Sequence, residues 1–470
     1  MKKDEGCGGE VEELKMWTQS HHLSWRESGQ SPLKLNIHIL SFFGQWTLSR
    51  SWPYRAYTVL SLVSIAVSLT MSVVGTCLLE GLEEVTSALT AFLPMVTGLA
   101  KALLLLCYQP DFNRLVRRLD ALILEQGGSW AQMKSVRAFE EAHRKTLVMT
   151  VLVNLYFVVV SVYWPMVPLL EDSETRRLPF VQLPWMKAAD AFHYWFVFFL
   201  QTYTTEAAGL ITVNVELYFL GVMSHISAQF EILSSRLTRL PRSSDYREAS
   251  FDGREPVVKR SPDIHEELCS CIKTHQKLLR GQLWCRSTES SAFRFIETLD
   301  DLMSPFAMAQ FAVGTLSVCV VLFQVMHSQL VSSKLKCAGW LPGLGLELFI
   351  YCWGGHQVAE QGEAVALAAY SAPWYEAGLD SQRAVHLMMC RAQKPPELTA
   401  GHLYTVNRAA FVSMQVQPDG AQRRQSGVGF RLPPPPPLPR ENSRRPVASA
   451  ASAAAASTRD RSADAARLQS

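Results

Sequence analysis

The chain has 470 residues and a formal net charge of +3, a balance that gives no sign of a nucleic-acid partner. Its mean hydropathy of +0.05 would suit a soluble protein, but that average combines long apolar segments with basic loops and a polar tail. The positions of the residues are therefore more informative than their totals.

Six apolar segments are each about as long as a membrane-spanning helix. About 20 mostly apolar residues cover the ~30 Å hydrocarbon core as a helix, and only helices or closed barrels satisfy the backbone polar groups in lipid. Alternating ten-residue strand patterns are absent, so helices are predicted. The segments are Tyr57–Leu79, Val85–Tyr108, Thr146–Leu170, Ala188–Met223, Ser304–Met326 and Ala338–Val358. The sequence thus predicts an all-α, multi-pass membrane protein.

Basic residues are concentrated in two of the connections between these helices. The connections between the second and third spans and between the fourth and fifth are rich in Lys and Arg, whereas the first-to-second and third-to-fourth connections are short and acidic or mixed. Lys and Arg mark the cytoplasmic side. We therefore expect a cytoplasmic amino terminus, an inverted topology relative to a G-protein-coupled receptor. Residues 1–30 lack the apolar core of a secretory signal, so the first span is expected to direct insertion.

The fourth apolar segment continues as a helical pattern beyond the length of a membrane span. No Pro or Gly cluster interrupts Ala188–Leu240, which would reach ~80 Å as a helix. A second amphipathic helix is expected from Ser261, a good N-cap, toward the fifth span. Together they predict a cytoplasmic helical layer that packs internally or against copies of the chain. The apolar stripe of the first extension consists of Ile226, Phe230, Leu233 and Leu237.

Neither an enzyme nor a cofactor is predicted. The chain has no P-loop, nucleophile elbow or HExxH motif. His265, Cys269, Cys271 and His275 have metal-like spacing, but on one helix their two pairs point about 200° apart and cannot close one tetrahedral site. We expect ordinary amphipathic-helix residues there and no metal.

Three ionisable residues within the predicted spans are further candidates, because charges in lipid are costly and often functional. Lys101 is expected to extend toward the inner interface, Glu206 to face a cavity or the bundle, and Glu216 to lie near the cytoplasmic interface. A structural polar contact is the preferred interpretation for both Glu residues.

Aromatic and sulfur-containing side chains gather in the outward halves of the second, third and fourth spans. Such residues, with few charges among them, could line an apolar pocket for a small hydrophobic ligand. Lipid-facing aromatic belts use the same residue types, so the group is a better candidate than any single member. The candidates are Phe92, Met95, Tyr163, Trp164, Trp195, Phe199 and Tyr203.

Four segments of the last quarter have a recognisable order and spacing. They are Phe349–His356, Ala369–Glu376, Met388–Pro395 and Leu398–Gly401. This arrangement closely resembles the carboxyl-terminal signature of insect odorant receptors. The resemblance covers about residues 30 to 414 and, before the last quarter, is mainly topological.

The resemblance implies a subunit of a ligand-gated, non-selective cation channel in the membrane of olfactory neurons that detects small hydrophobic volatiles. It also implies a heterotetramer with the odorant receptor co-receptor, and a pocket in the outer halves of the second, third, fourth and sixth spans. Because the chain lacks the co-receptor's extra cytoplasmic insertion, it resembles a tuning receptor. A short cytoplasmic helix over Arg383–Lys394 would help to hold the subunits together, and a span after Gly401 would line the pore.

Two groups of residues follow from this resemblance. The candidates for the subunit anchor are the stripe Ile226, Phe230, Leu233 and Leu237 together with Arg391 and Lys394, and the candidates for the pore are Leu403, Val406 and Ala410.

The sequence departs from the family pattern at the seventh span. Leu403–Val416 has 14 residues and contains Arg408, so it is too short to cross a bilayer. Gln415–Ser470 is rich in Pro, Ala and Arg and is not expected to form a packed element. We therefore expect a truncated seventh span and a gene-model or splicing fault in the tail.

The expected organisation has six parts. They are a cytoplasmic amino-terminal segment (1–52), spans one to four (53–223), a cytoplasmic helical extension and loop (224–303), spans five and six (304–358), a cytoplasmic helix with the start of an incomplete seventh span (359–414) and a low-complexity tail (415–470). A gustatory receptor channel subunit is the nearest alternative, with a different closing motif. A G-protein-coupled receptor would need the opposite topology and an Asn-Pro-x-x-Tyr ending.

Overall fold

The computed structural model describes the chain in separate stretches. These are residues 31–46 without 32, 51–79, 81–125, 132–170, 178–183 without 182, 191–240, 264–278, 295–328, 331–376 and 378–410. Contacts divide the chain into two compact units, Met1–Arg431 and Leu432–Ser470, and every described residue belongs to the first unit. The predicted tail from residue 415 therefore lies outside the described residues.

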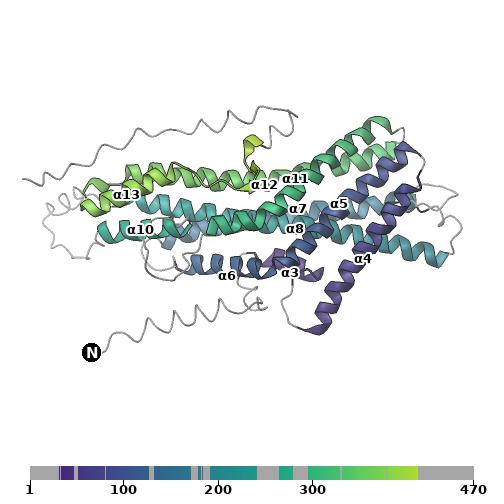
Figure 1. Ribbon diagram of the computed structural model, residues 1–470, viewed down its shortest axis with the longest axis horizontal. Coiled ribbons are helices and arrows are strands. Elements are labelled where there is room, and N and C mark those ends of the chain that lie inside the picture. Colours follow the sequence, from purple (N-terminus) through teal and green to yellow (C-terminus); the bar gives the residue numbers. More distant parts are fainter. Residues whose placement is uncertain are drawn as a thin grey trace, which may run out of the picture. The chain divides into compact units, whose positions relative to one another are not determined.

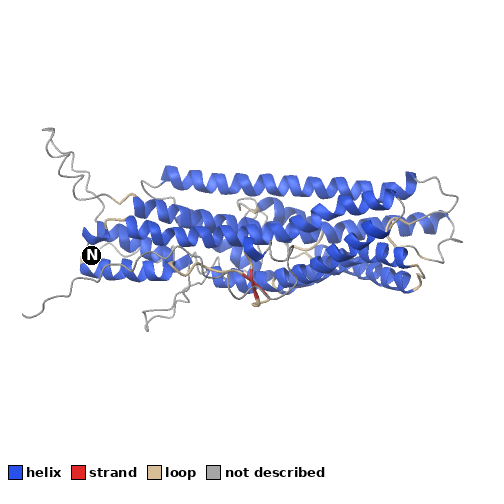
Figure 2. Ribbon diagram, turned by 90° about the horizontal axis from the view of Figure 1, so that it is seen from above, coloured by secondary structure: helices blue, strands red, loops and turns tan. Residues whose placement is uncertain are grey.

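Helices make up nearly all of the described part, with one short antiparallel strand pair (Figure 2). This confirms the predicted all-α fold. In chain order the elements labelled in Figure 1 and their neighbours are α3 (Lys34–Phe42), α4 (Trp52–Cys77), α5 (Leu82–Cys107), α6 (Gln109–Glu125), α7 (Gln132–Leu170), α8 (Ala191–Thr238), α10 (Ile264–Leu278), α11 (Phe295–His327), α12 (Val331–Ser371), the 3-10 helix η2 (Trp374–Glu376), α13 (Leu379–Ala392), β1 (Thr399–Ala400) and β2 (Tyr404–Thr405).

The long helices match the predicted spans. Among the described residues, α4, α5, α8, α11 and the Arg137–Met166 part of α7 are long and apolar enough to cross a membrane. The sixth predicted segment is a continuous part of α12. This helix is less apolar because it contains several Gly and the acidic Glu347, whose side chain is buried inside the bundle.

Six of the described helices pack against α8. It contacts α3, α4, α5, α7, α10 and α12, and 83% of its most apolar stretch is buried, compared with 33% for α4 and 22% for α7. The outer sides of α4 and α7 carry exposed apolar side chains such as Leu60 and Leu155, which suits contact with lipid. Helices α5 and α8 approach closely because a Cβ atom on Gly98 would lie 2.6 Å from Cβ of Ala208.

The predicted apolar stripe beyond the membrane is buried within the chain itself. Phe230 and Leu233 are 0% and 1% exposed, and this end of α8 packs with α10 (Figure 1). Arg236 Nη2 lies 2.8 Å from Glu267 Oε1 on α10. The stripe therefore needs no second chain to cover it. The predicted N-cap Ser261 lies outside the described residues, and α10 ends at Leu278, before the fifth span.

The amphipathic helix α10 also packs against α13. Its His275 side chain is 3% exposed, and burial, followed by the nearby Arg391 guanidinium, lowers the pKa of His275 to about 4. No group of three metal-binding side chains occurs in the described part of the chain. Arg391 and Lys394, at the end of α13, are both exposed.

Two helices, α3 and α6, were not predicted. The segment after α5 has many charges, but its apolar residues Phe112, Leu115 and Leu119 recur with helical spacing and are fully buried. Trp46, which follows α3, packs edge-on against Phe112 with ring centroids 5.8 Å apart. The amino-terminal segment is thus held to the bundle by aromatic packing.

The predicted start of the seventh span is not helical. Thr399 pairs with Thr405, and Ala400 with Tyr404, so the chain forms a short antiparallel hairpin here. Leu403 lies in its turn and is exposed, whereas Val406 and Ala410 are buried. Helical residues resume only at Arg408, so the apolar stretch that was expected to start the incomplete seventh span does not begin as a helix at Leu403.

Candidate functional site

Four helices enclose a small cavity rich in aromatic side chains, here called the aromatic cavity. Its walls come from α5, α7, α8 and α12, together with Phe180 from the segment before α8. Its volume is about 20 Å³, and about 10–15 Å³ is needed to hold one water. The cavity must therefore widen to admit an organic ligand. Its lining residues are Thr90, Ala91, Pro94, Phe157, Val160, Ser161, Trp164, Phe180, Thr205, Glu206, Gly209, Leu210 and Trp340.

Aromatic contacts close the walls of this cavity. Trp164 stacks on Phe180 with ring centroids 6.2 Å apart and planes at 8°. The Trp164 ring also meets Trp340 edge-on at 5.7 Å, and Phe157 lies 6.2 Å from Trp340. Flat, stiff rings of this kind provide contact area for an apolar ligand at little entropic cost.

A second cavity adjoins the first and shares Pro94, Phe157, Gly209 and Trp340 with it. We call it the polar cavity because Thr97, Thr212, Gln310, Ser317 and Glu347 also line it. Its volume is about 10 Å³, the size of one water-sized group. Val313, Gly314 and Leu344 complete the lining.

The structure brings one of the seven predicted pocket residues, Trp164, to the aromatic cavity. Met95 is buried nearby, with its sulfur 3.6 Å from Thr205 Oγ1, and Phe92 is half-buried. The remaining four, Tyr163, Trp195, Phe199 and Tyr203, are 42–62% exposed on the surface of the chain.

Sequence reasoning missed Phe157 and Trp340, which also line the cavity. Phe157 lies seven residues before Trp164, two helical turns along the same face of α7, and this periodicity could have identified it.

A buried network of charged and polar side chains connects four helices next to the polar cavity. Lys101 Nζ on α5 lies 2.5 Å from Glu216 Oε1 on α8 and donates to Gln310 Oε1 on α11 at 2.7 Å. Gln310 Nε2 donates to Glu347 Oε2 on α12 at 2.6 Å. Lys101 is 0% exposed and its amino group is paired inside the bundle, so the prediction that Lys101 extends to the interface is wrong. Glu216 makes the structural polar contact that was the preferred interpretation. The network satisfies charges that the bundle would otherwise bury unpaired.

Glu206 faces a cavity, as predicted. It lines the aromatic cavity and hydrogen-bonds Ser161 on α7. The aromatic cavity therefore has a carboxyl group on one wall.

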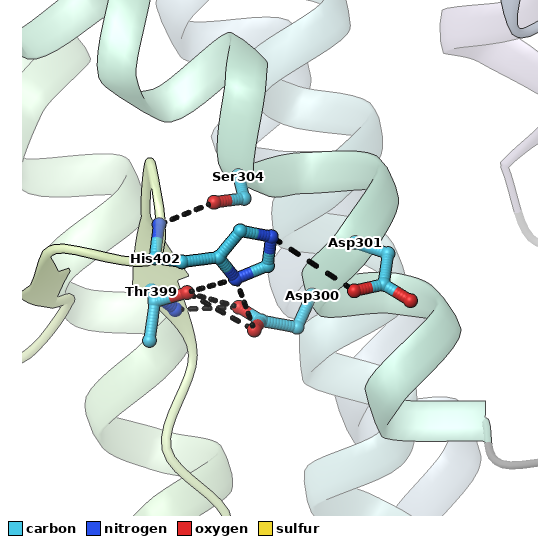
Figure 3. Close-up of polar contacts among 5 residues, drawn as sticks. All are labelled: Asp300, Asp301, Ser304, Thr399 and His402. Carbon is cyan, nitrogen blue, oxygen red and sulfur yellow. Dashed lines mark hydrogen bonds and ion pairs between the residues drawn. The ribbon is translucent and has the colours of Figure 1, made fainter.

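A second polar cluster attaches the β1–β2 hairpin to the start of α11 (Figure 3). The Asp300 carboxylate accepts hydrogen bonds from the Thr399 backbone N at 2.6 Å and from Thr399 Oγ1 at 3.0 Å. The backbone N of His402 donates to Ser304 Oγ at 3.0 Å, and that of Gly401 donates to the Ser304 carbonyl at 3.1 Å. The hairpin before the helical residues at Arg408 is thus fixed to the helix of the fifth span.

The turn of this hairpin needs an unusual backbone. Gly401 has φ +60° and His402 has φ +54°, a region that glycine adopts freely and other residues seldom do. The His402 ring lies between two carboxylates, with Nδ1 3.6 Å from Asp300 Oδ2 and Nε2 4.0 Å from Asp301 Oδ1. These contacts hold the left-handed turn against α11.

The fold and cavities together define a multi-pass membrane protein with two small adjoining cavities inside its helix bundle. The family model described as 7tm Odorant receptor matches residues 81–415. The chain therefore belongs to the odorant receptor family, and it is a membrane receptor rather than an enzyme.

Individual relatives agree with this assignment. The chain is 22% identical to odorant receptor 47a of Drosophila melanogaster over 77% of this chain and 89% of that protein. It is also 22% identical to odorant receptor 10a of the same species, over 81% of this chain and 91% of that protein. The solved olfactory receptor OR5 of Machilis hrabei in complex with eugenol is 16% identical, with a TM-score of 0.63 over 82% of this chain and 94% of that chain. This last similarity shows the shared fold.

Proposed function

We propose that the chain is the odorant-binding, tuning subunit of a ligand-gated, non-selective cation channel that assembles with the odorant receptor co-receptor. The observation that carries the proposal is the aromatic cavity enclosed by α5, α7, α8 and α12, within a chain of the odorant receptor family. Concave, mostly apolar sites with a few polar groups are typical of small-molecule binding. The ligand is a small hydrophobic volatile, and the amino terminus is cytoplasmic.

The proposed binding residues are those predicted from the sequence, with Trp164 in direct contact with the odorant. Met95 supports the cavity from behind through Thr205, which lines it. Tyr163, Trp195, Phe199 and Tyr203 face outward in this chain and would act from the lipid side or at a subunit contact.

The proposed subunit anchor combines a buried and an exposed part. The stripe of Ile226, Phe230, Leu233 and Leu237 holds the cytoplasmic layer together within the chain, so its influence on assembly is indirect. Arg391 and Lys394 are exposed and are the members that can reach a neighbouring subunit. Val406 would precede the pore helix and Ala410 would lie in its first turn, with the hairpin fixing its start.

Co-expression with the co-receptor in oocytes tests this function. Two forms should be compared: the chain as it stands, and a chimera in which residues 415–470 are replaced by the last span of a related odorant receptor. We expect odorant-evoked, cation-selective current above that of the co-receptor alone from the chimera and none from the chain as it stands, because 14 residues cannot cross a bilayer. Absence of current from the chimera, at normal surface expression, would contradict the channel proposal.

A further inference from the structure

Thr212 on α8 has a buried hydroxyl group without a hydrogen-bond partner among the described residues. The residue is 3% exposed and lines the polar cavity. Two other threonines of the same helix, Thr202 and Thr204, donate to the carbonyl oxygens of Phe198 and Leu200, four residues earlier, at 2.8 Å. Such a bond is the usual solution for a helical threonine away from water. The Thr212 hydroxyl is therefore free to bind a group that enters the cavity.

A second unpaired polar atom lies at the same place. Trp340 Nε1 on α12 also lacks a partner among the described residues, and its side chain lines both cavities. Buried polar groups are nearly always hydrogen-bonded in folded proteins, so each exception requires an explanation. Thr212 and Trp340 thus place two unpaired polar atoms on the walls of one small cavity.

An acceptor completes the cavity wall. The Glu347 carboxylate accepts from Gln310 Nε2 through Oε2, and a carboxylate has capacity for further hydrogen bonds. Gln310 Oε1 is already occupied by Lys101. The cavity wall thus combines the Glu347 carboxylate as a hydrogen-bond acceptor, the Trp340 indole N–H as a donor, and the Thr212 hydroxyl, which can donate or accept.

We propose that the polar cavity binds the hydroxyl head of an alcohol odorant, while the hydrocarbon part lies among the rings of the aromatic cavity. A hydroxyl donates to Glu347 and accepts from Thr212 or Trp340, whereas a ketone or ether oxygen can only accept. The cavity volume of about 10 Å³ fits one group of this size. The inference rests on the proposed odorant-binding function and specifies its ligand class.

Binding to the purified receptor in lipid nanodiscs tests the inference without any channel activity. Dissociation constants for 1-hexanol, its methyl ether and 2-hexanone are measured by quenching of tryptophan fluorescence, with empty nanodiscs as the control for partitioning into lipid. We expect 1-hexanol to bind at least about fivefold more tightly than the other two. Thr212→Val should remove most of this preference, and Thr212→Ser should retain it.

Thr202→Val is the matched control, because Thr202 lies on the same helix and lines neither the aromatic nor the polar cavity. It should leave the preference for hexanol unchanged, and thermal unfolding should confirm that each variant is folded. Equal affinities for the three compounds in the wild-type chain, or a preference that survives Thr212→Val, would overturn the inference. Hexanol preference without current from the chimera would instead contradict the channel proposal alone. If none of the three compounds binds, the inference fails, and the channel proposal is still decided by the current from the chimera.

Discussion

Lys101 Nζ lies 2.5 Å from Glu216 Oε1, and both side chains are completely buried inside the helix bundle. The pair has two further partners, since Gln310 joins Lys101 to Glu347. One positive side chain therefore lies among two acidic ones inside the bundle. Removing one member of such a pair is far more damaging than removing both.

Lys101→Met should lower the free energy of unfolding by about 3–5 kcal/mol, because it leaves the buried carboxyl groups without their cation. Glu216→Gln alone should also destabilise the receptor. The double variant Lys101→Met with Glu216→Gln should be closer to wild type than the sum of the two single effects. Thermal unfolding in detergent measures the stability of all three variants. If the effect of the double variant equals the sum of the two single effects, Lys101 and Glu216 are not coupled.

Trp164→Ala should change odorant sensitivity in the chimera, because Trp164 forms the stacked wall of the aromatic cavity with Phe180. Its neighbour Tyr163 is 42% exposed and lies outside the cavity, so Tyr163→Ala is the matched comparison and should change odorant sensitivity less. Dose–response currents at equal surface expression give the comparison. A larger effect from Tyr163 than from Trp164 would place the binding site elsewhere.

Asp300→Ala should release the β1–β2 hairpin from α11, because the Asp300 carboxylate accepts both hydrogen bonds of Thr399. Amide hydrogen exchange at Thr399, Gly401 and His402 should become faster by about tenfold, the equivalent of about 1.4 kcal/mol. Asp301 has a 74% exposed side chain and only a 4.0 Å contact with His402, so Asp301→Ala should leave exchange unchanged. If amide exchange becomes equally faster in Asp300→Ala and Asp301→Ala, the Asp300 carboxylate does not specifically hold the hairpin against α11.

Acidification should weaken the packing of α10 through His275. Burial, with a further contribution from Arg391, lowers the pKa of this residue from 6.5 to about 4. The unfolded chain therefore binds the proton more tightly than the folded one, and stability present above pH 6.5 is lost as the pH falls toward 4. The difference in Tm between pH 7.5 and pH 5 should be smaller in His275→Asn than in wild type. If His275→Asn shows the same difference in Tm between pH 7.5 and pH 5 as wild type, His275 is not the source of the acid sensitivity.

Phe230→Glu should prevent folding of the cytoplasmic layer, because Phe230 is fully buried in its own chain. Losing a buried Phe costs about 3–5 kcal/mol, and an unpaired buried charge adds to this. Thr238→Glu, at an exposed position of the same helix, introduces the same charge and should be tolerated. Yield and Tm of the receptor alone are the primary measurements. A Phe230→Glu receptor that is stable but no longer co-purifies with the co-receptor would show a direct subunit contact instead.

Local patterns determined most of the fold. Apolar length predicted the five confirmed spans, and the absence of Pro or Gly clusters through Ala188–Leu240 predicted the 48-residue helix α8. The amphipathic spacing that begins at Ile264 likewise predicted α10, because helix formation and its apolar periodicity depend on neighbours within a few residues. The apolar residues of α6, Phe112 among them, have an equally regular helical spacing, but the many charged residues of this segment meant that no helix was predicted there.

Only the tertiary structure decided which side of each spanning helix faces inward. Lipid and the bundle interior are both apolar, so hydropathy cannot distinguish Trp164, in the cavity, from Tyr163, on the surface. The partner of Lys101 lies 115 residues away on another helix, a relationship that no local spacing contains. The unpaired Thr212 hydroxyl is a property of the packed bundle as well. The sequence by itself determined the helices and the membrane class, and the packing of α8 against its neighbours determined the cavities and the buried network between them.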